Sequence, residues 1–398
     1  MANTSCNEIA QELLGYCLRG EAWPRAHLER LLEDECTDAL FRIVVEGLAD
    51  RFDPALCRVY EDLFGEVLWR THSCVPCRLQ STPVSTRVST RHAGVRAPRH
   101  VFVLSRITLG ADVAVTSVIL DAAKRRFPEA EIYLAGPRKN WELFAADPRI
   151  RHLAVNYRRG SLQDRLAHIP ELREAIDHPD ALVIDPDSRL TQLGLVPVCA
   201  PENYLFFESR SYGAESDAAL PELTSRWVCE TLGVADARPF IAPAEQPHVK
   251  RPAISVSLGV GENAAKRIAD PFEPELLRML GAKGATIYID EGAGGEEAER
   301  VERAVTASGL PRGQIETWRG SFAGFAAIIR ASDFYAGYDS AGQHVAAACG
   351  VPLLCVFAGF PCLRMFQRWH PTGPGPIEVI QVDDPDPSTL LARIQGVP

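Results

Sequence analysis

The sequence lacks the features of three common protein classes. No run approaches the ~18 consecutive apolar residues that a membrane-spanning helix needs, so we expect no transmembrane segment. The 52 acidic residues outnumber the 42 lysines and arginines, and the net charge of −10 disfavours nucleic acid as a main partner. At the N-terminus no basic segment precedes an apolar core, so the sequence predicts no signal peptide and a cytoplasmic protein.

A metal site also finds little support in the sequence. Cys74 and Cys77 are the one close pair among 11 cysteines, and His72 lies nearby. A zinc site needs a second pair of ligands at similar spacing, and none follows, so two loop thiols are favoured over a structural metal. The remaining cysteines are scattered, which predicts free thiols in a reducing compartment. We expect neither a metal nor a cofactor.

The chain is too long for one compact core, so its 398 residues predict two or three domains. Residues 1–70 carry apolar side chains at three- and four-residue spacing, which predicts a small helical N-terminal module with a scaffold or partner-docking role. Its expected helices are 6–18, 25–32, 37–49 and 54–69. Residues 71–99 are rich in Ser, Thr, Pro and Arg and predict a linker, whose arginines are either solvated or a surface for an anionic acceptor.

From residue 100 onward strands alternate with helices, which predicts an α/β fold with parallel, doubly wound sheets. The expected strands are 100–105, 131–135, 181–185, 204–207, 253–258, 285–290, 334–335 and 353–357. A Pro-rich connector at 239–250 separates a first Rossmann-like half, 100–238, from a second half, 251–398, and the two are expected to face a cleft. No GxGxxG follows the first strand with an acid downstream, so a dinucleotide-dependent dehydrogenase is disfavoured.

The stretch 331–357 predicts the most informative site. A polar turn at 338–342, Tyr-Asp-Ser-Ala-Gly, opens a helix of small residues between two apolar strands. Ligands of open α/β sheets bind at the carboxyl ends of strands, and a helix N-terminus offers N–H groups to a phosphate. The turn therefore predicts a phosphate site, beside which His344 is either packed or a ligand-binding residue.

Four other side chains are candidates for chemistry, each with an ordinary alternative. Asp112 at the start of the first helix is either an N-cap or a general base at the cleft. Lys266 is either a surface lysine or a counter-charge for a diphosphate. Glu296 and Glu297 open a helix after a Gly-rich turn, where they either complement the helix dipole or bind ribose hydroxyls.

Together these features resemble glycosyltransferase family 9, the lipopolysaccharide heptosyltransferases, from about residue 100 to the end. The segment 339–352, DSAGQHVAAACGVP, is similar to the family signature D-[ST]-G-x-x-H-x-x-A-A-x-x-x-P, with Ala341 in place of Gly. Further segments that resemble the family are 106–120 (RITLGADVAVTSVIL), 124–128 (KRRFP), 291–304 (EGAGGEEAERVERA) and 318–322 (WRGSF). The resemblance implies a GT-B fold of two Rossmann-like domains. It also implies inverting transfer of a heptose-like sugar from a nucleotide sugar, commonly ADP-linked, without an obligatory metal.

The resemblance further implies roles for single residues. Asp112 would be the catalytic base that deprotonates the acceptor hydroxyl. The implied donor-binding residues are Lys266, Glu296, Glu297, Gly320, Asp339, Ser340, Ala341, Gly342 and His344. Lys266 and the N–H groups of 340–342 would hold the diphosphate, and Glu296 or Glu297 the ribose. The backbone near Gly320 would hold the nucleotide base, and Asp339 would contact the donor sugar.

Two departures from the family pattern affect this site. Ala111 is an extra residue between Gly110 and Asp112, which can turn the acid away from its target. Ala341 adds a Cβ where the backbone should approach a phosphate closely. A different acceptor, a different donor or a weakened enzyme would each account for them.

The acceptor stays open among a glycan, a lipid-linked anionic glycan, a protein side chain and a small metabolite, and a lipid-linked acceptor would imply peripheral contact with a membrane. A non-catalytic sugar-nucleotide-binding or scaffold protein, working through the helical module, is the second hypothesis. An epimerase-like enzyme is disfavoured because no second base is evident near Asp112.

Overall fold

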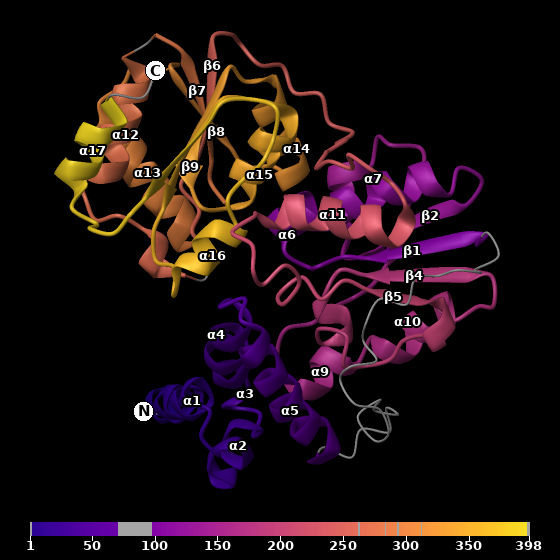
Figure 1. Ribbon diagram of the computed structural model, residues 1–398. Coiled ribbons are helices and arrows are strands. Elements are labelled where there is room, and N and C mark those ends of the chain that lie inside the picture. Colours follow the sequence, from indigo (N-terminus) through magenta and orange to yellow (C-terminus); the bar gives the residue numbers. More distant parts are fainter. Residues whose placement is uncertain are drawn as a thin grey trace.

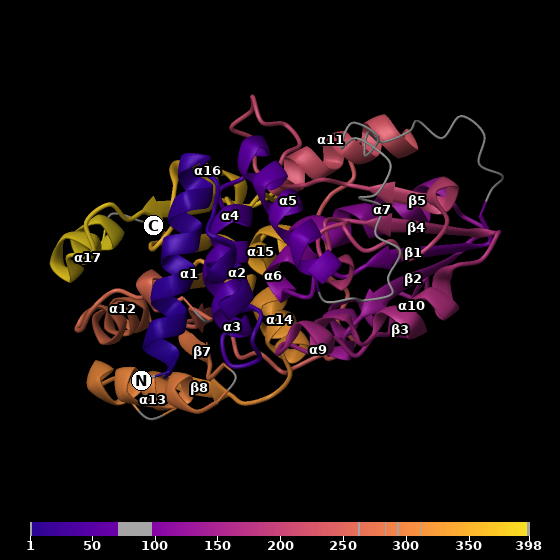
Figure 2. The ribbon, with the colours of Figure 1, turned by 90° about the horizontal axis from the view of Figure 1, so that it is seen from below.

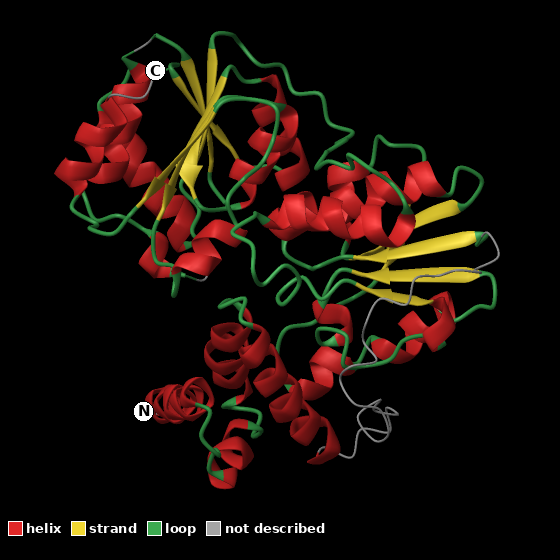
Figure 3. Ribbon diagram, viewed as in Figure 1, coloured by secondary structure: helices red, strands yellow, loops and turns green. Residues whose placement is uncertain are grey.

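The computed structural model describes residues 2–70, 98–261, 263–282, 284–292, 294–311 and 313–395, which form a helical N-terminal segment and two parallel α/β units (Figures 1 and 3). Among these residues, no helix combines the length and the apolar character that crossing a membrane requires. The linker predicted at 71–99, with Cys74 and Cys77, falls almost wholly outside the described residues.

The helical module predicted at the N-terminus contains helices in each of the four expected places. They are α1 (Ala2–Arg19), α2 (Arg25–Leu31), α3 (Thr37–Ala39), η1 (Leu40–Val45), α4 (Glu46–Ala49) and α5 (Pro54–Arg70). Cys6 and Cys36 form a disulfide, with Cα atoms 5.3 Å apart, so the expectation of free thiols is wrong for this pair. The packing of α1 against the segment before α3 brings these residues together, and their separation of 30 positions does not reveal it.

The first half is a five-stranded parallel sheet in the order β3-β2-β1-β4-β5. Its strands are β1 (His100–Leu104), β2 (Glu131–Gly136), β3 (Ile150–Ala154), β4 (Ala181–Asp185) and β5 (Tyr204–Phe206). Figure 1 shows α7 (Ser117–Arg126) and α11 (Leu220–Leu232) on one face of the sheet and α9 (Leu162–Leu166) and α10 (Ile169–Ile176) on the other. The strand order reverses between β1 and β4, which is where ligands of doubly wound sheets bind.

The second half repeats this plan with six parallel strands in the order β11-β10-β9-β6-β7-β8. They are β6 (Ala253–Ser257), β7 (Thr286–Asp290), β8 (Ile315–Trp318), β9 (Phe334–Tyr338), β10 (Leu353–Phe357) and β11 (Ile377–Gln381). One face carries α12 (Phe272–Gly281), α13 (Glu296–Ser308) and α17 (Pro387–Gln395), and the other carries α14 (Phe322–Ala331) and α15 (Ala341–Cys349) (Figure 1). The predicted βαβ unit at 331–357 is thus β9-α15-β10, at the centre of this sheet.

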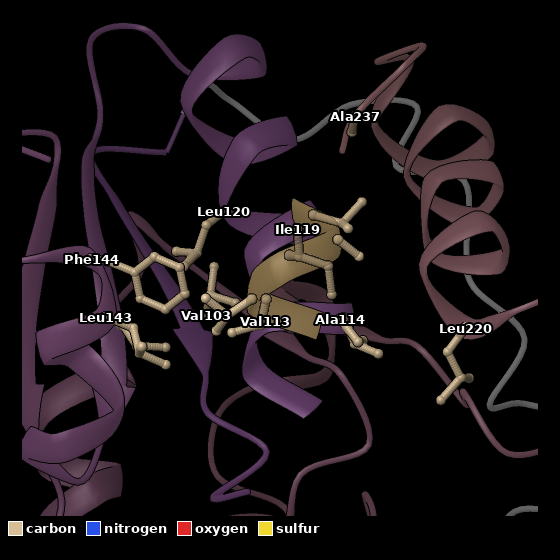
Figure 4. Close-up of a cluster of buried hydrophobic side chains, with 14 of the residues drawn as sticks. Val103, Val113, Ala114, Ile119, Leu120, Leu143, Phe144, Leu220 and Ala237 are labelled. Carbon is tan, nitrogen blue, oxygen red and sulfur yellow. The ribbon is translucent and has the colours of Figure 1, made fainter. Parts of the chain in front are cut away.

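A continuous apolar core fixes the first turn after β1. Figure 4 shows Val113 and Ile119, from the helical segment that follows β1, packed with Val103 of the strand and with Phe144. The same cluster continues into α14 and α15 of the second half, through residues such as Phe325 and Val345. The two halves therefore share a core on one side of the cleft, which holds the ends of β1 and β9 at a fixed separation.

The helical module packs against both halves. Leu13 and Phe64 belong to one buried cluster with Phe102 and Leu104 of β1, so the module extends the core of the first half. Figures 1 and 2 agree in placing the module beneath the junction of the halves. The loop after α4 reaches α16 (Leu363–Arg368) of the second half, where Arg364 Nη1 donates to the Phe52 carbonyl at 3.1 Å.

We predict that Phe64→Ala destabilises the module and the first half together, because Phe64 is 1% exposed and lies in their shared core. Loss of a buried Phe side chain costs about 3–5 kcal/mol. In denaturant unfolding, tryptophan fluorescence and circular dichroism should report the same single transition, at a lower denaturant concentration than in the wild type. Leu18→Ala, at a 36% exposed position of the same module, is the matched control. A separate early transition of helical signal alone would contradict the shared core.

Candidate active site

A cavity of about 460 Å³ opens where the two halves and the helical module meet. This volume is in the range of small-molecule sites. The loops after β1, β6 and β9 form most of its wall, so both sheets present the carboxyl ends of their strands to one space. The ionisable side chains on the wall are Asp50, Arg106, Lys139, Arg159, Asp187, Arg189, Arg210, Lys266, Asp290, Glu297, Asp339 and His344.

In the second half, Lys266 and Asp339 meet at the end of the central strands. Lys266 follows β6, and its Nζ lies 2.5 Å from Asp339 Oδ2 and 3.3 Å from the Asp339 carbonyl oxygen. Gln343 Nε2 donates to the second carboxylate oxygen of Asp339 at 2.5 Å. The lysine is thus held over the start of α15, with its charge balanced by a carboxylate that is 6% exposed.

The N-terminus of α15 faces the cavity through Ser340 and Ala341, and its N-cap Ser340 makes no side-chain capping hydrogen bond. Gly342 lies behind this surface and does not line the cavity. A Cβ at Gly342 would overlap the Tyr335 hydroxyl, so glycine is needed there for packing against Tyr335. Ligand contact by the 340–342 backbone is therefore restricted to the side of Ser340 and Ala341.

The two candidate glutamates separate in the structure. Glu297 lines the cavity, and a Cβ at Gly259, after β6, would overlap its carboxylate. Glu296 is exposed and lies outside the cavity wall. Next to Glu297, burial raises the pKa of Asp290 to about 6, against an opposing hydrogen bond from the Gly292 N–H. Of the alternatives left open by the sequence, Glu297 is the one positioned to meet a ligand.

Gly320 lies outside the cavity wall, in contrast to its predicted contact with a nucleotide base. The Trp318 ring covers it so closely that a Cβ at Gly320 would overlap the indole. Phe322, two residues on, is the part of this segment that does line the cavity.

His344 lies on the cavity wall, and its ring meets Trp369 edge-on with centroids 5.9 Å apart. Burial lowers the pKa of His344 to about 4, while the nearby Asp339 opposes the shift. The imidazole is therefore neutral at pH 7.

Asp112 does not reach the cavity, although Gly110 and Ala111 beside it do. The residue is 0% exposed, and its carboxylate accepts four hydrogen bonds at 2.6–2.7 Å. The donors are the Ser105 hydroxyl, the Arg106 N–H, the Thr116 hydroxyl and the Asn140 amide. Burial raises the pKa of Asp112, and these four hydrogen bonds oppose the rise.

This placement argues against the catalytic role predicted for Asp112. A general base needs a free lone pair within hydrogen-bond reach of the proton that it removes, and the lone pairs of Asp112 are directed into the protein. Its carboxylate instead ties the end of β1 to the following helix and to Asn140. Gly110, at the same turn, permits direct contact between the halves, because a Cβ there would lie 3.2 Å from Ala341 Cα.

Several cations of the first half were not predicted from the sequence. Arg106 Nη1 donates to the Pro186 carbonyl at 3.0 Å, and burial lowers the pKa of Arg106 to about 10, so it stays charged at pH 7. Arg210 pairs with Asp187 at 2.7 Å. Arg106 follows β1, and Asp187, the partner of Arg210, follows β4. Ligands of such sheets bind at the carboxyl ends of the strands, so the position of these residues after the strands could have predicted that they line the site.

Within the ranges that the structure describes, no group of three or more His, Cys, Asp or Glu residues could hold a metal ion. Cys74 and Cys77 lie outside those ranges.

No protein-family model and no curated protein matches the chain. Its structure is similar to E. coli heptosyltransferase WaaC with ADP, at 15% identity and a TM-score of 0.53, over 74% of this chain and 99% of that one. WaaC was also solved with ADP-2-deoxy-2-fluoro heptose. A family 9 glycosyltransferase from Veillonella parvula DSM 2008 matches at 17% identity and a TM-score of 0.54, over 76% and 92% of the two chains. E. coli ADP-heptose LPS heptosyltransferase II matches at 18% and 0.50, over 74% and 97%.

These likenesses confirm that the fold is the two-domain GT-B type of glycosyltransferase family 9 that the motifs resemble. They also show how much of this chain has no counterpart in WaaC. WaaC is matched over 99% of its length while 26% of this chain is left over. The unmatched quarter of this chain is similar in length to residues 1–99, which precede the first Rossmann-like half.

We predict that Asp112→Asn lowers the free energy of unfolding by about 1–3 kcal/mol, because an amide N–H₂ replaces an acceptor that two buried donors share. The measurement is denaturant unfolding at pH 7. Asp121→Asn, on α7 with only an i,i+4 pair to Arg125, is the control and should change the free energy of unfolding by about 0.5 kcal/mol or less. Unchanged stability in Asp112→Asn would contradict a structural role for this carboxylate.

We predict that His344 makes stability fall as the pH is lowered. Its pKa is about 4 in the folded protein and about 6.5 in an unfolded chain, so the unfolded state binds more protons between these values. Lowering the pH from 7.5 to 5 should remove about 2 kcal/mol that His344→Gln does not lose. Unfolding free energies of both proteins at the two pH values test this, with the exposed His248→Gln as control. Equal pH dependence in wild type and His344→Gln would refute the buried neutral state.

Proposed function

We propose that the protein is an inverting glycosyltransferase that moves a heptose-like sugar from an ADP-linked donor to an acceptor hydroxyl. The observation that carries this proposal is the cavity between the two halves, walled on one side by Lys266, Glu297 and the open N-terminus of α15. The family 9 fold and the ADP-containing ligands of its WaaC neighbour support the choice of donor.

The second half supplies the parts that a nucleotide diphosphate needs. Lys266 and the N–H groups near Ser340 and Ala341 would neutralise the diphosphate, since a helix N-terminus carries a positive dipole end. Glu297 is positioned to accept hydrogen bonds from ribose hydroxyls, beside a Gly259 that leaves room for its carboxylate. Asp339 would exchange its contact with Lys266 for one with the donor sugar.

In the reaction, the acceptor oxygen attacks the anomeric carbon from the face opposite the diphosphate, which gives inversion. The bond from the anomeric carbon to the phosphate oxygen breaks, and the nucleoside diphosphate leaves with the electron pair. Preorganised positive groups stabilise the charge that develops on the leaving group. Lys266 and α15 take this role, so the proposal requires no metal ion and no cofactor.

The first half would bind the acceptor. Lys139, Arg159 and Arg189 lie on its part of the cavity wall and favour an acceptor that carries negative charge, such as an anionic glycan. A lipid-linked form of it would bring the protein to a membrane surface, and a protein acceptor is the remaining alternative. The cytoplasmic location expected from the sequence stays a prediction.

A non-catalytic nucleotide-sugar-binding protein is the second candidate. The observation that favours it is the burial of Asp112, the acid in the position of the family's base. Turnover of a nucleotide sugar distinguishes the two, because a binding protein releases the donor intact.

We predict that Lys266→Gln weakens ADP binding about 10- to 150-fold, the equivalent of about 1.5–3 kcal/mol for one charged hydrogen bond. Calorimetric titration with ADP, ADP-sugars and UDP-sugars in the presence of EDTA provides the measurement. Lys250→Gln, an exposed lysine of the connector, is the matched control and should bind ADP as the wild type does. Failure of the wild type to bind any of these nucleotides would refute the proposed function.

A further inference from the structure

The loop that follows α4 carries an unusual acid into the cavity. The loop joins α4 to α5, and Phe52 adopts a positive φ of 53° within it. The Phe52 ring is 1% exposed and meets Trp369 edge-on at 6.2 Å, while its carbonyl accepts from Arg364. These contacts with the second half anchor the loop and fix the direction of its neighbour Asp50.

Asp50 is half-buried and lines the cavity. Its carboxylate makes no hydrogen bond or ion pair with any other residue that the structure describes. Arg189 and Arg210 of the first half and Lys266 of the second half all interact with it electrostatically. Asp50 is thus the part of the cavity wall that the helical module contributes, and it interacts electrostatically with cations of both halves.

The other acids of the cavity are engaged or lie on the donor side. Asp187 is paired with Arg210 at 2.7 Å, and Asp339 is paired with Lys266. Asp290 and Glu297 belong to the second half, beside the proposed donor. An inverting displacement needs its base on the face opposite the leaving group. Asp50 is the acid of the described cavity wall that combines a free carboxylate with a position outside the donor half.

We propose that Asp50, supplied by the N-terminal helical module, is the general base of the transfer. This inference rests on the proposed glycosyltransferase function. The acceptor O–H bond breaks as its proton passes to an Asp50 carboxylate oxygen, and the oxygen lone pair forms the bond to the anomeric carbon. The bond between that carbon and the phosphate oxygen breaks, and its electron pair leaves with ADP.

The surroundings of Asp50 raise its proton affinity above that of an ordinary aspartate. Burial raises the pKa of Asp50, and so does the neighbouring Glu46 of α4, while Arg210, Arg189 and Lys266 oppose the rise. A base is active only in its ionised form, so turnover should fall as the pH drops through this pKa. The pH below which the turnover rate falls should therefore lie above the ordinary aspartate pKa of about 3.9.

The test uses the full-length chain, with ADP-heptose as donor and water as acceptor, and follows ADP release. Asp50→Asn should lower turnover about 10²- to 10⁴-fold without weakening ADP binding, since the lost negative charge interacts with Lys266 and would oppose a bound diphosphate. The acid limb of the pH profile should disappear in Asp50→Asn and persist in Asp50→Glu. Asp34→Asn, at an exposed acid of the same module, should behave as the wild type.

Azide as acceptor separates a base from a structural residue. Azide attacks as an anion and has no proton to lose, so Asp50→Asn should transfer the sugar to azide at the wild-type rate. Loss of both reactions in a folded variant, or turnover with water above half of the wild-type value, would overturn the role of Asp50. Either result leaves donor binding by the wild type intact, and so differs from failure of the proposed function itself.

Discussion

Direct contact between Gly110 and Ala341 determines how the two halves of the molecule share one site. A Cβ at Gly110 would lie only 3.2 Å from Ala341 Cα, so the turn after β1 and the start of α15 touch at the backbone. In a doubly wound sheet the ligand lies beyond the carboxyl ends of the strands. Because these two turns adjoin, the carboxyl ends of both sheets open onto the same cavity, and neither half has a complete site of its own.

The helical module adds a third wall to this arrangement. Most of its apolar side chains pack with the first half, as Phe64 does, whereas Phe52 belongs to the cluster that the two halves share. The module is therefore held by the first half and reaches the second half through the loop after α4. Any change in the separation of the halves must displace that loop, and Asp50 with it, relative to Lys266. The geometry of the proposed base thus depends on the closed arrangement of all three parts.

The sequence predicted the strands that are apolar runs, including the edge strand β5, and missed the other three edge strands, β3, β8 and β11. Strands buried on both faces of a parallel sheet are nearly continuous apolar runs, as in β1, β6 and β10. At the edges, β3, β8 and β11 contain polar residues such as Arg151, Glu316 and Glu378, which hide their pattern.

The proximity of Lys266 and Asp339 follows from the sequence for a local reason. Lys266 and Asp339 follow the central strands β6 and β9, so knowing the strands was enough to bring the two residues together. The direction of Asp112 depends on Asn140, 28 residues further on. The loop that carries Asp50 is held by the contact of Phe52 with Arg364, more than 300 residues away. Spacing carries no information about either contact.

The same comparison explains why a raised pKa does not by itself identify a base. Burial raises the pKa of both Asp112 and Asp50. At Asp112 the lone pairs are occupied by four donors, so a substrate proton has no place to bind. At Asp50 the cations Arg210, Arg189 and Lys266 act electrostatically, and the carboxylate accepts no hydrogen bond from any residue that the structure describes. Desolvation raises the proton affinity of a carboxylate. A substrate can transfer its proton to that carboxylate only if it can reach one of the lone pairs.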